Sequence, residues 1–296
     1  MNKHVFWIAS YPKSGNTLLR SIISSLFFSS KGNFDFKLLR NIPVIEDTIN
    51  LNFLKNKNLG DYNNIHKAEI ISKYWLDIQQ KENLKFEGDF MFAKTHHGLI
   101  KFGDKPFTTQ DFTRGYIYII RDPRDVVISF SKHLNISVDK SIKNLINYKF
   151  ALEWQDNRNL FKNKNKPFSF LSSWNHHCNS WINNDFKCPS LVIKFEDLVL
   201  KKEICIDKII NFFVHNFGFK FHNIEEKKIN ILETTKFDFL QRKEIDQGFI
   251  ESVNNNFFSS GKINQWKDKL NKNEIEEIEK NFYPLMNKFG YKTIYY

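Results

Sequence analysis

Cysteine is scarce in this sequence, which has three in 296 residues, at Cys178, Cys188 and Cys205. Such a small and odd number gives no disulfide framework, and it predicts a protein of a reduced compartment. The His-His-Cys run that ends at Cys178 lacks a second pair of ligands at a zinc-site spacing, so we expect no metal site.

Long apolar runs are also absent. The first ten residues, MNKHVFWIAS, lack the longer apolar region and the small-residue cleavage site of a secretory signal. The next apolar stretch, SIISSLFFSS, is too short and too rich in serine to span a bilayer. We therefore expect a cytoplasmic protein without stable membrane insertion. No internal repeat or long linker divides the sequence.

Acidic residues are too few to balance the basic ones, since 44 Lys and Arg face 33 Asp and Glu, a difference of 11. A positive surface attracts anions such as nucleotides, acidic glycans, nucleic acid or lipid headgroups, although the same lysines could merely solvate the protein. With 41% hydrophobic and 16% aromatic residues, the chain can bury a sizeable core. We expect a single domain over residues 1–296.

Runs of β-branched and aromatic residues predict buried strands at residues 4–10, 90–94, 115–120 and 190–198. Residues 31–64, rich in Asn and Lys, predict short helices and loops over the sheet edge. Strands that alternate with helical patterns predict an α/β fold of three layers, with a central parallel β-sheet flanked by helices. Ligands bind such sheets at the carboxyl ends of the strands.

Apolar spacing predicts helices at residues 65–80, from Pro123 onward, at residues 203–217 and at residues 271–291. A helical pattern also follows the first strand directly. The segment 242–262 is rich in Gly, Asn and Ser, and it predicts a mobile loop.

The stretch PKSGNT, residues 12–17, lies between the first predicted strand and a helix. A loop in this place offers unpaired backbone N–H groups and the positive end of the helix dipole, so it binds phosphate or sulfate readily. Gly15 would let the backbone approach an oxyanion, and Lys13 adds a full charge. The lysine precedes the glycine by two residues, so the G-x-x-x-x-G-K-[ST] loop of ATPases is absent.

Charged and titratable residues also follow two further strands. AKTHH places Lys94 and His96 at the end of the second strand, and IIRDPRD places Arg121 at the end of the third. Because the carboxyl ends of parallel strands meet at one edge, we expect these residues near Lys13.

Five segments, in order, resemble the sulfotransferases that use 3′-phosphoadenosine-5′-phosphosulfate (PAPS). YPKSGNT is similar to the family's 5′-phosphosulfate loop, AKTHH to its catalytic-histidine segment, and YIIRDPRDVVISF to its 3′-phosphate segment. SSWNHHCNSW with VIKFEDL, and later SSGKINQWK, resemble further family stretches. The matches spread from Tyr11 to Lys267, so the resemblance implies the P-loop NTPase-like sulfotransferase fold over nearly the whole chain.

The resemblance implies catalytic roles for three residues. Lys13 would stabilise the leaving phosphate, His96 would take the proton of the acceptor, and Lys94 would neutralise the sulfonate oxygens. Arg121, with Ser129, would hold the 3′-phosphate through its planar fork. The residues implied to bind PAPS, as co-substrate, are Lys13, Ser14, Gly15, Asn16, Thr17, Arg121, Ser129, Phe195, Phe237, Ser260, Gly261 and Lys262.

Several positions depart from the family's pattern. Leu18 stands where the family usually has a tryptophan over the adenine ring, and Phe237 is the best remaining aromatic lid. Phe195 replaces the tyrosine of Y-E-D. Ser259 replaces an arginine, and Asn264 replaces a later glycine, so a strong charge on the 3′-phosphate is missing and donor affinity could be reduced.

Three other functions stay open from the sequence. A nucleotide-binding protein of the same fold could have lost turnover, a kinase could use a variant phosphate loop, and a basic chain rich in aromatics could bind single-stranded nucleic acid. The phenylalanines sit mostly in apolar runs, which is typical of a core, so we expect no nucleic-acid partner. The acceptor would be a small molecule, a glycan or a lipid headgroup, and a homodimer stays open.

Overall fold

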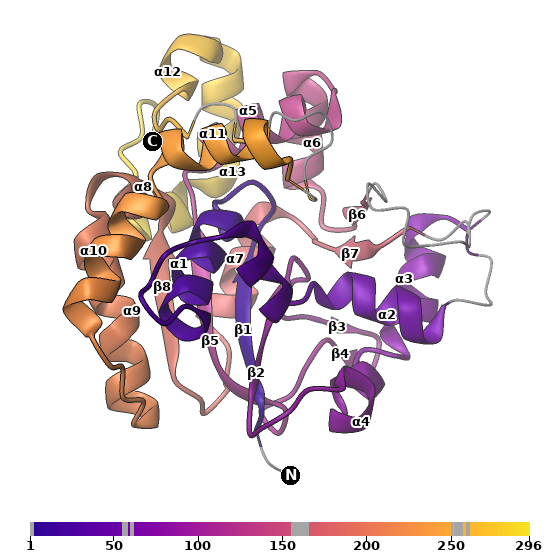
Figure 1. Cartoon of the computed structure of the whole chain (residues 1–296). Coiled ribbons are helices and arrows are strands. Elements are labelled where there is room, and N and C mark those ends of the chain that lie inside the picture. Colours follow the sequence, from indigo (N-terminus) through magenta and orange to yellow (C-terminus); the bar gives the residue numbers. More distant parts are fainter. Residues whose placement is uncertain are drawn as a thin grey trace.

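The computed structural model describes residues 3–54, 59, 62–154, 166–249, 251, 257–258 and 261–296, with only the backbone at 50 and 51. Its elements in chain order are β1 (Val5–Ser10), α1 (Asn16–Phe28), η1 (Phe36–Asn41), α2 (Ile45–Phe53), α3 (Asn64–Ser72), η2 (Asp77–Gln79), α4 (Lys81–Leu84), β2 (Met91–Thr95), β3 (Lys101–Phe102), β4 (Lys105–Pro106), β5 (Thr113–Ile120), α5 (Pro123–Leu134), α6 (Val138–Ile146), β6 (Ala151–Glu153), β7 (Phe168–Phe170), α7 (Trp174–Ile182), β8 (Ser190–Lys194), α8 (Phe195–Leu200), α9 (Lys202–Phe217), α10 (Ile224–Thr234), α11 (Phe237–Gln247), α12 (Trp266–Lys269) and α13 (Lys272–Lys288) (Figure 1).

A four-stranded sheet in the order β2-β1-β5-β8 forms the centre of the molecule (Figure 1). Its neighbouring strands all pair in parallel, so their carboxyl ends lie at the same edge. The chain reaches this edge at Ser10, Thr95, Ile120 and Lys194, where the four strands end. The predicted α/β architecture around a central parallel sheet is confirmed.

Each face of the sheet buries its own apolar core. Val5 and Trp7 of β1 pack on one face with residues of α5, α7 and α13. Phe6 and Ile8 alternate with them and pack on the other face with residues of α1, α9 and α10. Side chains of a strand point to opposite faces in turn, so an unbroken apolar run such as VFWIA fits a strand that is covered on both sides.

Three sequence-based boundaries are wrong. The strand expected at 190–198 ends at Lys194, and Phe195–Leu200 form α8, because Glu196 and Asp197 favour a helix's first turn. The helix expected at 65–80 breaks after Ser72, before the short η2. Helix α11 runs to Gln247, so the loop expected from residue 242 overlaps a helix, and most of its remainder lies outside the described residues.

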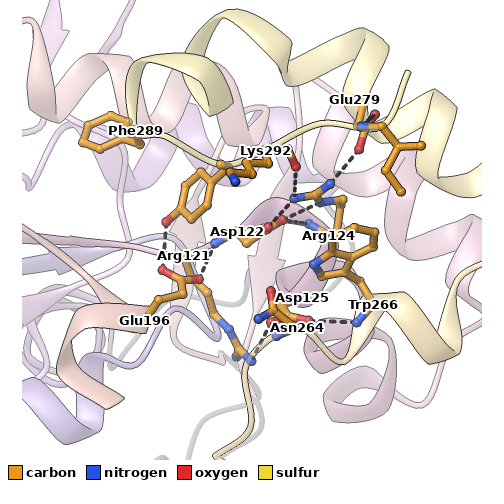
Figure 2. A network of polar contacts seen from close by, with 12 residues as sticks. Arg121, Asp122, Arg124, Asp125, Glu196, Asn264, Trp266, Glu279, Phe289 and Lys292 are labelled. Atoms are coloured by element: carbon orange, nitrogen blue, oxygen red, sulfur yellow. Dashed lines mark hydrogen bonds and ion pairs between the residues drawn. The ribbon is translucent and has the colours of Figure 1, made fainter. Parts of the chain in front are cut away.

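A buried ion network joins the start of α5 to the end of the chain (Figure 2). Arg124 donates to Asp122 at 2.7 Å and to Glu279 of α13 at 2.6 Å, and the side chains of all three are less than a tenth exposed. Arg124 also donates to the carbonyl of Lys292 and lies 3.7 Å from the ring centroid of Trp266. Each buried charge therefore has its partners, which is the condition for keeping charges inside a protein.

Arg124→Met should lower the free energy of unfolding by about 3–5 kcal/mol, because Asp122 and Glu279 would stay buried without their cation. Unfolding in guanidinium chloride measures the loss. As a control, Lys143→Met breaks an exposed helical pair with Asp139 and should leave the midpoint unchanged. A wild-type midpoint for Arg124→Met would contradict the importance of this network.

Two small hairpins, β3-β4 and β6-β7, lie outside the central sheet. In Figure 1 both lie on the side of the sheet where α2, α3 and α4 are found. No helix in the described part of the chain is both long and apolar enough to cross a membrane.

Candidate active site

The turn between β1 and α1 places the predicted anion loop at the carboxyl edge of the sheet. Lys13 and Gly15 both have a positive φ, of 66° and 97°. The ring of Phe195 packs against Gly15 so closely that a Cβ there would lie 2.4 Å from it. Only glycine fits this position, because a side chain would be strained by the backbone and would clash with the ring.

The amino end of α1 is open. The first amides of any α-helix lack an intrahelical partner, and here the N-cap, Gly15, has no side chain that could accept from them. The hydroxyl of Ser14 is buried and has no hydrogen bond in the described part of the protein. Asn16 points back toward β1 and donates to the carbonyl of Ile8 and the hydroxyl of Ser10. Asn16 thus fixes the loop, while the free amides and Ser14 can receive an anion.

His96 follows β2 directly and is 7% exposed. Its Nδ1 lies 2.8 Å from the carbonyl oxygen of Ser10, and because a carbonyl only accepts, Nδ1 carries the proton. In the neutral ring Nε2 is then the unprotonated nitrogen. His177 on α7 donates to the carbonyl of His96, and the ring of Trp154 stacks on the imidazole at 5.1 Å.

Positive charges gather around this histidine. Burial, followed by the charges of Arg121 and Lys94, lowers the pKa of Lys13 to about 8. Burial also lowers the pKa of Lys94. Burial and the charge of Lys94 hold the pKa of His96 well below its usual range. Burial, with the charges of Lys13 and Lys94, lowers the pKa of His133 on α5 to about 3. An anion placed here would relieve this repulsion.

Arg121 ties two loops together at the end of β5. It donates to the carbonyl of Lys13 at 2.9 Å and to that of Lys262 at 3.1 Å. Its guanidinium lies 4.4 Å from the ring centroid of Phe195. Asp125 is 3.9 Å away, but its oxygens accept the backbone N–H groups of Asn264 and Trp266, as Figure 2 shows.

The other predicted PAPS-binding residues in the described part of the chain come from several elements. Phe237 begins α11, and its ring would lie 2.4 Å from a Cβ at Gly261. Thr17 is buried on the first turn of α1 and Ser129 is partly exposed on α5, while the side chain of Lys262 is exposed. Ser260, and Ser259, which replaces the family's arginine, lie outside the described residues.

The model of the sulfotransferase domain matches residues 3–290. This chain belongs to the sulfotransferase family. The resemblance carried by its loop, histidine and arginine segments is thereby confirmed at the level of the family.

Several related proteins resemble this sulfotransferase. The 3-beta-hydroxysteroid sulfotransferase of Cavia porcellus is 22% identical over 281 residues, which are 92% of this chain and 79% of that protein. Mouse sulfotransferase SULT7A1 complexed with PAP has a TM-score of 0.59 at 17% identity, over 97% of this chain and 86% of that chain. Retinol dehydratase in complex with androsterone and inactive cofactor PAP has a TM-score of 0.61 at 17% identity, over 97% and 81%. The predicted sulfotransferase fold is confirmed.

Three residues that contact this edge of the sulfotransferase could not be identified from sequence patterns: Glu46, Trp154 and Glu244. Glu46 accepts the backbone N–H of His96, and Trp154 covers its ring. Glu244 of α11 accepts the N–H groups of Phe257 and Phe258, and the ring of Phe257 lies 4.7 Å from Nζ of Lys13. None of the three belongs to a motif, because each reaches the site only through the folded chain.

Gly15→Ala should destabilise the protein by about 1–3 kcal/mol through backbone strain, and further through the contact with Phe195. Gly88→Ala is the matched control, since Gly88 has a φ of 86° but no described atom within 4 Å of its Cβ position. Chemical unfolding measures both variants. An equal loss for the two would show that Phe195 does not constrain the loop.

Proposed function

We propose that this sulfotransferase moves a sulfuryl group from PAPS to a hydroxyl or amine of an acceptor by in-line transfer. The S–O bond to the 5′-phosphate breaks, a bond from sulfur to the acceptor atom forms, and the acceptor's proton goes to Nε2 of His96. The observation that carries this proposal is the gathering of Lys13, Lys94 and His96 at one edge, with Nδ1 of His96 already bonded to Ser10.

Lys13 would stabilise the leaving group. As the bond to sulfur breaks, negative charge grows on the bridging oxygen, and a cation on the loop that cradles the 5′-phosphate can donate to it. The open amino end of α1 and the free hydroxyl of Ser14 support the same placement of the phosphate. Gly15 and Thr17 would let the backbone and a hydroxyl complete the cradle.

His96 would act as the general base. The ring is neutral near pH 7 because its pKa lies well below the usual range, so Nε2 can accept a proton. A low pKa alone would make it a weak base. The negative charges of a bound donor would offset the charge of Lys94 and raise the pKa toward neutrality, where such a base is worth about 10²–10⁴-fold in rate.

Lys94 and Arg121 would each bind one of the other charged groups of the donor. Lys94, one residue before the end of β2, would neutralise the sulfonate oxygens, and Arg121 would bind the 3′-phosphate together with Ser129 and Lys262. Nε of Arg121 is buried and makes no hydrogen bond within the described residues, which supports a further ligand there. The relatives solved with PAP support an adenosine bisphosphate as the nucleotide.

The names of the relatives support a class of acceptor but not one particular acceptor. Solved complexes of a related enzyme hold androsterone or retinol, and a relative in sequence is named for a hydroxysteroid. These names support a small-molecule alcohol as the acceptor, ahead of a glycan or a lipid headgroup.

Calorimetry with adenosine 3′,5′-bisphosphate tests the donor. We expect it to bind at least about tenfold more tightly than AMP or ATP, because Arg121 would contact its 3′-phosphate. Lys13→Ala should weaken this binding, whereas Lys105→Ala, at an exposed lysine of β4, should not. Tighter binding of ATP than of adenosine 3′,5′-bisphosphate would contradict the proposal and favour a kinase.

The same binding should depend on pH through Lys13. Below pH 8 the side chain is protonated in the free protein, so affinity stays level. As the pH rises past 8, binding must take up a proton, and affinity should fall about tenfold per pH unit. Calorimetry between pH 7 and 9.5 follows this fall, and Lys13→Ala should abolish it. A slope that persists in the variant would assign the titration to another group.

A further inference from the structure

Glu46 lies on the first turn of α2, outside every motif of the sequence, and it is 2% exposed. One oxygen, Oε1, accepts three hydrogen bonds: from the hydroxyl of Thr95 at 3.0 Å, the backbone N–H of His96 at 2.7 Å and the hydroxyl of Ser169 at 3.1 Å. Its other oxygen, Oε2, is buried and makes no hydrogen bond within the described residues, so Oε1 makes all of the printed contacts. A buried carboxyl group that accepts this many hydrogen bonds is part of the packed structure and not a solvated surface group.

The position of Glu46 is set by backbone pairing with β2. The N–H of Lys94 donates to the carbonyl of Pro43 at 2.9 Å, and Val44 forms an isolated parallel bridge with Lys94. Helix α2 begins directly after this bridge, at Ile45, and its first turn places Glu46 beside the backbone of His96. The contacts between residues 43–44 and the edge strand β2 therefore place the carboxyl group of Glu46 next to His96.

The hydroxyl of Ser169 continues the chain of contacts on β7. It donates to Glu46 and accepts from Nε1 of Trp154 at 2.8 Å. The ring of Trp154 stacks on His96 at 5.1 Å and 30°, and Nζ of Lys94 lies 5.8 Å from its centroid. The contacts close a circuit: Glu46 holds the backbone of His96 directly and holds the face of its ring through Ser169 and Trp154.

We propose that Glu46 is the positioning residue of His96 and that it fixes the imidazole from its backbone and from its stacked face together. This inference rests on the proposed function, in which His96 is the base. With Ser10 bonded to Nδ1, a third side of the ring is fixed, and Nε2 keeps one direction. A base held in one orientation matters because small displacements of a reacting group cost about 10²-fold in rate.

Histidine and tryptophan ring nitrogens, labelled with ¹⁵N, report the circuit without any acceptor. The His96 and Trp154 signals are assigned by their loss in His96→Ala and Trp154→Phe. In Glu46→Ala, which removes the acceptor of all three hydrogen bonds, we expect both the His96 ring signals and the Trp154 indole signal to shift. Affinity for adenosine 3′,5′-bisphosphate should stay within about twofold, since Glu46 touches no donor-binding residue of the loop.

Glu153→Ala is the matched control. Glu153 precedes Trp154 and pairs with Lys67 on α3, so its loss removes a nearby carboxylate without touching the circuit. Both signals should stay in place there. Unmoved His96 and Trp154 signals in Glu46→Ala would overturn the inference.

Ser169→Ala is a second test that does not depend on whether Glu46→Ala folds. It removes the acceptor of Trp154 but leaves the bond from Glu46 to the His96 backbone, so the indole signal should shift while the tautomer of His96 stays largely Nδ1–H. An unchanged indole signal would also overturn the inference. Failure of the proposed function is seen separately, as a lack of preference for the bisphosphate in the wild-type protein.

Discussion

Repulsion among cations at one edge of the sheet is the constraint on which the site depends. Parallel pairing brings the ends of β1, β2 and β5 together, and with them Lys13, Lys94 and Arg121. Burial lowers the pKa of both lysines, and at Lys13 the charges of Arg121 and Lys94 lower it further, so holding these groups together costs folding free energy. An anionic ligand bound at this edge would offset the unfavourable arrangement, and the relief would contribute to its binding.

The parts of the fold that could be predicted from sequence are those that local chemistry decides. Apolar runs buried on both faces became β1, β2 and β5 within a few residues of their expected bounds. The loop after β1 and the residues at the strand ends followed, because a parallel sheet has one carboxyl edge. Phe195 was expected near the nucleotide and lies against Gly15 and Arg121, which is a packing relation that no pattern gives.

What could not be predicted depends on contacts between distant segments. Glu46 comes from a stretch without a readable motif, and only its pairing with β2 brings it to His96. Arg121 was expected to serve a phosphate alone, yet it also donates to two loop carbonyls that are far apart in the sequence. The early end of β8 follows from acidic residues that favour a helix start, although the apolar run before them favours a strand.

Residues 292–295 are hydrogen-bonded to the buried ion network around Arg124. Glu279 accepts the N–H groups of Ile294 and Tyr295, and Arg124 donates to the carbonyl of Lys292 (Figure 2). A fusion partner or surface tether appended beyond Tyr296 would pull on the hydrogen bonds that link residues 292–295 to Arg124 of α5 and Glu279 of α13. A tether at the amino end would pull on β1 at Val5, at the opposite edge of the sheet from Lys13 and Gly15, and is the better attachment point for immobilising the enzyme.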